Sequence, residues 1–281
     1  FPTRRSSDLA QKIIDLSGKW SFSIDRQDNG EKEKWFSHTL NDCINLPGSM
    51  PEKLKGDEVT AKTQWTGSLY DSSYYYNPYM EKYRKEGNIK FPFFLTPDKH
   101  YVGAAWYQKE VNIPADWKGE RILLFLERPH IETTVWVNGQ KTGMQNSLCV
   151  PHQYDITRYV RPGKCTITIR VDNRIKEINV GPDSHSITDQ TQGNWNGIVG
   201  RICLQTTPKT YFDDIQIYPE PEQKLARVKV VIKGAGITKI KLSAESFNTD
   251  KKHIVPAIQQ EIKLNKGVTE TEMVLPMGND M

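Results

Sequence analysis

The chain has 281 residues, of which 37% are hydrophobic and 26% charged, with a formal net charge of +4. This length allows two domains of ordinary size, and basic residues are scattered among acidic ones, so nothing indicates a nucleic-acid partner. No apolar run reaches the roughly 18 residues that a membrane-spanning helix needs, so no membrane span is expected.

The first segment, residues 1–12, is unlike the rest of the chain. It has no hydrophobic periodicity and resembles translated adapter sequence, and Ala10-Gln11 is typical of the end of a removed export signal. We expect a non-native or processed extension that takes no part in the fold.

Alternation with a period of two predicts the first strand. Within residues 14–24, Trp20, Phe22 and Ile24 alternate with polar residues, as in a strand with one buried face. The pattern recurs along most of the chain, and no long amphipathic helix interrupts it. The sequence therefore predicts an all-β protein.

Two irregular segments follow this strand. Residues 25–44 are polar, with Trp35 and Phe36 as isolated apolar anchors. Residues 55–100 are rich in tyrosine, phenylalanine and tryptophan and are punctuated by glycine and proline. We interpret residues 55–100 as an ordered insertion across the sandwich surface, with a short helix around residues 78–85.

Regular strands resume after the insertion. They are expected at residues 105–111, 121–126, 133–137, 166–171 and 201–205. Asn138-Gly139 supplies the two positive-φ residues of a type I′ turn, which predicts a hairpin over residues 133–143. In the middle of its first strand, Trp136 is expected to fill the sandwich core.

A change of composition at residues 206–209 predicts a domain boundary. Beyond it, short strands are expected at residues 215–218, 225–233, 240–247, 257–264 and 269–275. Turn signals at residues 234–236 and 265–267 would separate some of them. Five strands are fewer than the usual seven of an immunoglobulin-like sandwich. We expect residues 209–281 to be an incomplete sandwich, less stable than residues 13–208.

No local motif indicates nucleophilic, nucleotide or metal chemistry. GxSxG, HExxH, P-loop and GxGxxG patterns are absent, and the six histidines are scattered. The four cysteines, Cys43, Cys149, Cys165 and Cys203, form no CxxC pair, so no zinc site is expected. Their disulfide state stays open.

Paired carboxylates, the machinery of glycoside hydrolysis, are also not evident. The one comparable spacing within a strand is Glu270 and Glu272, and an exposed sheet face is the favoured interpretation. We therefore expect no catalytic residues, no metal ligands and no cofactor in this chain.

Sugar recognition has better support. Sugar sites combine aromatic platforms with amide and carboxylate side chains, and the loop of residues 183–197 has this inventory. Trp195, which lies between two asparagines, suits a site and a structural role equally. The segment 65–83 has a similar inventory, but packing of the insertion is favoured for Tyr74 to Tyr76.

Eight segments occur in an order that resembles glycoside hydrolase family 2. They are Leu16-Ser-Gly-Lys-Trp20, Leu46-Pro-Gly48, Ala105-Trp-Tyr-Gln-Lys-Glu-Val111, Trp117-Lys-Gly119, Val135-Trp-Val-Asn-Gly139, Tyr154-Asp-Ile-Thr157, Val171-Asp-Asn173 and Trp195-Asn-Gly-Ile-Val-Gly-Arg201. The form with an aromatic insertion is similar to those of gut Bacteroidetes. The resemblance covers residues 13–208 well and 209–281 weakly.

The resemblance implies a domain order and an activity. A jelly-roll (galactose-binding-like) sugar-binding β-sandwich over residues 13–208 would precede the truncated immunoglobulin-like β-sandwich. The family's two catalytic glutamates lie in a following TIM barrel, which this chain lacks. The parent would be a β-galactosidase-like retaining exo-β-glycosidase, periplasmic or secreted, without an organic cofactor. Its partners would be a terminal β-linked sugar and its own barrel, and this fragment alone would be inactive.

The resemblance also directs attention to substrate-facing loops. In family galactosidases an acidic residue stands two positions before the loop tryptophan, and here that position is Gly193. Neighbouring residues and a second loop before Trp106 would then contact the sugar. The expected substrate-binding residues are Asp189, Gln192, Asn194, Trp195, Asn196, His100 and Tyr101.

Two other functions fit the pattern less completely. A stand-alone carbohydrate-binding module without hydrolase activity would also use a jelly roll with aromatic loops. A β-sandwich adhesion or scaffold domain would expose an interface and bind no sugar, but it does not explain the ordered motifs.

Overall fold

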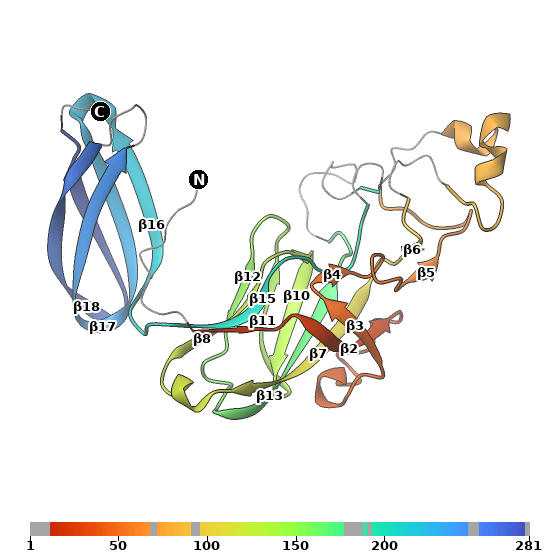
Figure 1. Ribbon diagram of the computed structural model, residues 1–281, viewed down its shortest axis with the longest axis horizontal. Coiled ribbons are helices and arrows are strands. Elements are labelled where there is room, and N and C mark those ends of the chain that lie inside the picture. Colours follow the sequence, from red (N-terminus) through yellow and green to blue (C-terminus); the bar gives the residue numbers. More distant parts are fainter. Residues whose placement is uncertain are drawn as a thin grey trace. The chain divides into compact units, whose positions relative to one another are not determined.

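The computed structural model describes residues 12–67, 72–90, 96–176, 188–189, 193–246 and 253–278 (Figure 1). Strands dominate these residues, which confirms the predicted all-β fold. The chain divides into two compact units, the first ending at Thr206 and the second starting at Thr207. Of the expected extension over residues 1–12, only Lys12 lies within the described part.

Two antiparallel sheets form the sandwich of the first unit. The larger has six strands in the order β11-β10-β13-β7-β2-β3. Its strands are β2 (Gly18–Asp25), β3 (Asp42–Leu46), β7 (Ala104–Ile113), β10 (Glu132–Val137), β11 (Gln140–Asn146) and β13 (Gly163–Asp172). The smaller has the order β1-β15-β8-β12, with β1 (Ile13–Asp15), β8 (Arg121–Leu126), β12 (His152–Asp155) and β15 (Ile202–Thr207).

The main core lies between these two sheets. Phe22 and Ile169 enter it from the larger sheet, and Leu124 and Leu204 from the smaller one, all fully buried. The alternate residues that enter this core follow from the predicted period-two pattern. Tight packing of such apolar side chains supplies the main driving force for folding of this unit.

The predicted hairpin is confirmed. It joins β10 to β11 through Asn138 and Gly139, whose φ angles are +50° and +77°. These values suit a type I′ turn, whose twist matches that of the flanking strands.

Trp136 packs on the opposite face of the larger sheet from the one expected. Its neighbours Val135 and Val137 point into the main core, so alternation turns the indole outward. There it contacts Trp106, with ring centroids 4.9 Å apart, and stacks on Phe36 at 5.2 Å. Trp35 and Phe36, which the sequence suggested were isolated anchors, lie in the 3₁₀ helix η1 (Trp35–Ser37) and pack against this second apolar cluster.

The insertion has a small core of its own. Its described elements are the β5–β6 ladder (Asp57–Glu58 with Lys99–His100) and the 3₁₀ helices η2 (Ser72–Tyr75) and η3 (Pro78–Tyr83). Tyr74 is fully buried among partly buried Trp65, Met80 and Tyr83. The predicted short helix is confirmed, and packing is confirmed for Tyr74 but not for Tyr75 and Tyr76, which are exposed.

A third sheet of the first unit brings distant segments together. Strand β14 (Gly197–Ile198) lies between β4 (Gly48–Ser49) and β9 (Pro129–His130). The remaining short helix of this unit is η4 (Ala115–Trp117).

The described residues of the second unit form three strands where five were expected. Strands β16 (Tyr211–Glu220), β17 (Leu225–Ser246) and β18 (His253–Pro276) form one antiparallel sheet, with η5 (Pro221–Gln223) between the first two. The expected turn at residues 234–236 is a bulge, where Gly234 pairs with Gly267 and the register then shifts. Val230 and Ile240, from either side of this bulge, share one apolar cluster, so the long strands bend over themselves.

None of the described helices is long and apolar enough to cross a membrane. The four cysteines are free thiols: Cys43 and Cys149 are exposed, whereas Cys165 and Cys203 are buried.

A substitution at Gly30 tests how tightly residues 25–44 pack on the larger sheet. A Cβ there would lie 2.5 Å from Trp106 Nε1 and 2.7 Å from Asp25 Oδ2. We expect Gly30→Ala to cost about 1–3 kcal/mol of unfolding free energy, because neither neighbour can withdraw easily. All seven tryptophans precede residue 196, so urea unfolding followed by tryptophan fluorescence reports the first unit.

Gly143→Ala is the matched control in strand β11. Its Cβ would meet the Tyr154 ring at an ordinary 3.6 Å, so stability should stay level or rise slightly. Equal losses in both variants would contradict the proposed close packing.

Candidate functional site

Three buried asparagines form the centre of the candidate site, and we call them the amide cluster: Asn173, Asn194 and Asn196. Asn173 directly follows β13, and the other two precede β14. All three are at most 3% exposed. Each therefore needs partners for its side-chain amide within the protein.

Asn173 and Asn194 hold each other and two backbone segments. Asn173 Nδ2 donates to Asn194 Oδ1 at 3.0 Å and to the Tyr101 carbonyl at 2.9 Å, and Asn173 Oδ1 accepts from Gly103 N at 2.8 Å. Asn194 Nδ2 donates back to the Asn173 carbonyl at 3.0 Å. The loop before β14 is thereby fixed to the ends of β13 and of the insertion.

Asn196 fixes the same loop to the sandwich. Its Nδ2 donates to the carbonyls of Gly103 and Val171, both at 2.9 Å, and its Oδ1 accepts from the Tyr107 hydroxyl at 2.7 Å. Burial raises the pKa of Tyr107, so this hydroxyl stays a hydrogen-bond donor. The side-chain amide is fully used within the fold.

Asp189 is the acidic member of the site and is 3% exposed. Its Oδ1 accepts from Asn194 N at 2.6 Å, and its Oδ2 accepts from Thr66 N at 2.5 Å. His100 Nε2 lies 3.4 Å from the same Oδ2, and it has no hydrogen-bond partner within the described part of the chain. The carboxylate thus joins the loop before β14 to the insertion.

Trp195 stands between these buried residues but is itself only half-buried. Its indole stacks on His130, with centroids 4.6 Å apart and planes 20° from parallel. His130 is 5% exposed, and its Nε2 has no hydrogen-bond partner among the residues that the structure describes. Burial lowers the pKa of His130 to about 4, against the opposing effect of the Asn194 amide.

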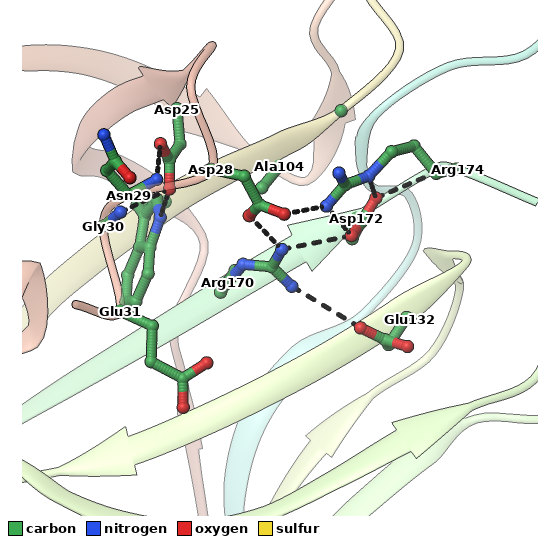
Figure 2. A network of polar contacts seen from close by, with 12 residues as sticks. Asp25, Asp28, Asn29, Gly30, Glu31, Ala104, Glu132, Arg170, Asp172 and Arg174 are labelled. Atoms are coloured by element: carbon green, nitrogen blue, oxygen red, sulfur yellow. Dashed lines mark hydrogen bonds and ion pairs between the residues drawn. The ribbon is translucent and has the colours of Figure 1, made fainter. Parts of the chain in front are cut away.

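A charged network lies on the outer face of the larger sheet, at the end of β13 (Figure 2). Asp172 is fully buried and accepts from Arg170 at 3.1 Å, from Arg174 at 2.6 Å and from Lys176 at 2.9 Å. Although burial opposes ionisation, hydrogen bonds from these cations hold the pKa of Asp172 well below its ordinary value.

Two further carboxylates complete the network. Asp28 bonds to Arg170 and to Arg174, each at 2.6 Å, and Glu132 bonds to Lys176 at 2.7 Å. Beside it, Asp25 accepts from Gly30 N and from Trp106 Nε1. The network therefore ties the covering segment to β13 and to β10.

The structure brings most of the expected site residues together. Asn194 and Asn196 belong to the amide cluster, and Asp189 accepts from Asn194 N. His100 lies beside Asp189, and the Tyr101 carbonyl accepts from Asn173. The Tyr101 hydroxyl donates to the Ala104 carbonyl at 3.0 Å. Trp195 lies beside the cluster on His130, and Gln192 lies outside the described residues.

Asn173, Thr66 and His130 belong to the site but were not expected there. Asn173 was within a recognised motif, yet nothing in that motif distinguished its role. Thr66 lies 123 residues before Asp189, so no local pattern could pair them. The carboxylate of Asp189 lies 3.8 Å from where a Cβ of Gly193 would stand.

The amide cluster and Asp189 use their polar atoms in hydrogen bonds within the protein. Among the residues with assigned positions, no group of three ligating side chains could hold a metal ion. Glu132 and Asp172 both contact Lys176, but the lowered pKa of Asp172 keeps it ionised and unsuited to donate a proton. Glu270 and Glu272 are exposed on β18, as predicted.

Asp172→Asn should destabilise the first unit by about 3–5 kcal/mol at pH 7, because Arg170 would lose a buried partner. The pKa of Asp172 is lowered in the fold, so its contribution is present above its ordinary value of 3.8 and is lost as pH falls below it. The difference between variant and wild type should therefore shrink in acid. Urea unfolding at several pH values measures both effects.

Glu110→Gln is the control for Asp172, since its ion pair with Lys164 is solvent-exposed. We expect its unfolding midpoint to match that of wild type. A similar midpoint for Asp172→Asn would show that the buried network contributes little.

His130 should make the first unit acid-sensitive between about pH 6.5 and 4. Its pKa is lower in the fold than in the unfolded chain, so the unfolded state binds the proton first as pH falls. The unfolding free energy should therefore decrease by up to about 3 kcal/mol through this window. His130→Phe should retain the stacking on Trp195 and flatten the stability profile. His152, also buried with a lowered pKa, stays in both proteins, so identical slopes would contradict the assignment to His130.

Comparison with known proteins places this geometry in context. Human beta-glucuronidase is 24% identical over 83% of this chain and 35% of its own length, and that of Paenibacillus borealis is 27% identical over 74% and 31%. The chain thus spans about a third of the length of these curated relatives.

Solved structures share the fold. A beta-glucuronidase from an uncultured Clostridium species superimposes with a TM-score of 0.58 and 20% identity, over 99% of this chain and 41% of that one. The Ruminococcus gnavus enzyme in complex with D-glucuronic acid gives 0.58 and 18%, over 96% and 40%. The family model "Glycosyl hydrolases family 2, sugar binding domain" matches residues 13–208. The chain therefore belongs to glycosyl hydrolase family 2.

Proposed function

We propose that these 281 residues are a non-catalytic, sugar-binding part of a retaining exo-β-glycosidase that removes terminal β-D-glucuronic acid. The catalytic barrel would be supplied by the rest of the protein. This assignment refines the β-galactosidase-like activity expected from the sequence.

The observation that carries the proposal is the family match together with the named activity of the relatives. The matched relatives from mammals and from Paenibacillus are beta-glucuronidases, and so are the superimposed bacterial enzymes. Gly193 also departs from the acidic position of family galactosidases, which favours a different sugar.

The arrangement of charges supports a non-catalytic role. A retaining glycosidase needs one protonated carboxylic acid and one carboxylate about 5 Å apart. One candidate pair in the described site is Glu132 and Asp172, which share Lys176 as a partner. These ion pairs keep Asp172 in its charged form, so the pair suits scaffolding.

The expected sugar contacts divide into two roles within this proposal. Asp189, Asn194 and Asn196 are buried and use their polar atoms inside the protein, so they would position the loop. Trp195 is only half-buried and rests on His130, so its indole would offer the apolar surface against which a sugar ring packs.

The activity is tested with two proteins: the 281-residue chain and the product of the complete reading frame that contains it. We expect the chain to bind D-glucuronic acid in isothermal titration and to hydrolyse no nitrophenyl β-glycoside. The complete protein should hydrolyse nitrophenyl β-D-glucuronide in preference to the β-D-galactoside and β-D-mannoside.

Other outcomes would contradict the proposal in distinct ways. Turnover by the chain alone that a single carboxylate substitution abolishes would place catalysis in these residues. Preference of the complete protein for the galactoside would restore the original expectation. A complete protein that binds glycans without hydrolysing any would be a stand-alone binding module.

A further inference from the structure

Asp189 and Thr66 form a reciprocal link between two distant segments. Thr66 N donates to Asp189 Oδ2 at 2.5 Å, and Asp189 N donates to the Thr66 carbonyl at 3.1 Å. Asn194 Nδ2 adds a bond to Thr66 Oγ1 at 3.1 Å. Three hydrogen bonds thus join the insertion to the loop that carries Trp195.

The link reaches the body of the insertion through Trp65. This neighbour of Thr66 packs against Tyr74, as Met80 and Tyr83 do, in the small core of the insertion. It also lies against His100, with ring centroids 4.8 Å apart. Through Trp65, Thr66 is therefore connected to Tyr74 in η2 and to His100 in β6.

The same carboxylate also shapes the loop itself. Asp189 Oδ1 accepts from Asn194 N at 2.6 Å, one residue before Trp195. Charge-assisted hydrogen bonds from backbone N–H groups to a buried carboxylate are strong, and loss of the acceptor would leave two buried donors without partners. The Asp189 side chain consequently fixes both Thr66 of the insertion and the backbone next to Trp195.

We propose that Asp189 is a positioning residue that joins the insertion to the Trp195 loop, so that the insertion forms one wall of the sugar site. This inference rests on the proposed function, because it takes the ligand of that loop to be a carbohydrate. It assigns the aromatic insertion a place beside the sugar rather than on a remote surface.

Four variants of the 281-residue chain separate positioning from direct sugar contact. Asp189→Asn weakens the bonds of the carboxylate to Thr66 N and to Asn194 N. Thr66→Pro removes the N–H that donates to Asp189 Oδ2 and also the Oγ1 that accepts from Asn194 Nδ2, and it leaves the Asp189 side chain in place. The double variant measures their coupling. Gln64→Pro is the control, since it places proline in the same segment at an exposed residue whose amide has no part in the link.

Affinity for D-glucuronic acid is measured by isothermal titration, with the tryptophan-fluorescence melt of each variant as a check on folding. We expect Asp189→Asn and Thr66→Pro each to weaken binding at least tenfold, and the double variant to be no weaker than either alone. Gln64→Pro should bind as wild type does.

Three titration results would overturn the proposal. Wild-type affinity in both single variants would show that the link does not matter to binding. Loss in Asp189→Asn with full affinity in Thr66→Pro would place the carboxylate in direct contact with sugar. Losses that add in the double variant would show that the two residues act independently.

Hydrogen exchange keeps the test decisive if Thr66→Pro fails to fold. In wild type, D-glucuronic acid should slow exchange in residues 193–196 and also in residues 57–67 and 72–90. In Asp189→Asn the protection of the insertion should disappear, whereas unchanged protection there overturns the proposal.

A wild type that binds no sugar is distinguishable from failure of the link. Absence of binding by the wild type would contradict the proposed function and, with it, the assignment of the insertion as one wall of the sugar site. The link is then judged from the unliganded proteins: faster exchange of both segments in Asp189→Asn supports it, and faster exchange of the loop alone overturns it.

Discussion

The need to pair every buried polar group governs the end of strand β13. The end of β13 lies beside the residues that lead into β7, and backbone carbonyl and N–H groups of both segments need buried partners. The amide cluster satisfies them: Asn173 bonds to Gly103 N and the Tyr101 carbonyl, and Asn196 bonds to the carbonyls of Gly103 and Val171. Side-chain amides suit this task because each offers donors and an acceptor.

A second consequence of the same strand end is electrostatic. Asp172 precedes Asn173 and points to the opposite face, where Arg170, Arg174 and Lys176 neutralise it (Figure 2). Asp28 extends this network to the segment that covers Trp106 and Trp136. Adjacent residues of one motif therefore hold the two faces of the larger sheet to different parts of the chain.

Membership of glycosyl hydrolase family 2 gives this arrangement its functional meaning. In the described residues the half-buried Trp195 stacks on the buried His130. The carboxylates of the charged network are held in ion pairs, which favours support over acid catalysis. Both features agree with the proposal that this chain binds sugar and that another part of the protein cleaves the bond.

Much of the fold followed from local patterns. Period-two alternation predicted strands β2, β7, β8, β10, β13 and β15 of the first unit, though not β3 or β12. Asn138-Gly139 predicted the hairpin turn. These predictions succeeded because they depend on the conformation of a few adjacent residues. The ordered motifs indicated the family for the same reason. In the second unit the glycines of residues 234–236 were interpreted as a turn, but cross-strand pairing continues through them as a bulge.

Only the tertiary structure decided which face buries Trp136 and which partners satisfy the site. Alternation places the indole on one of the two faces of the larger sheet but does not say which. Both faces are apolar there, because the segment around Phe36 covers the face opposite the main core. The bonds from Asp189 to Thr66 and from Asn173 to Asn194 join residues far apart in the chain. Local sequence determines backbone conformation and the buried face of a strand, whereas such contacts exist only after packing has brought separate segments together.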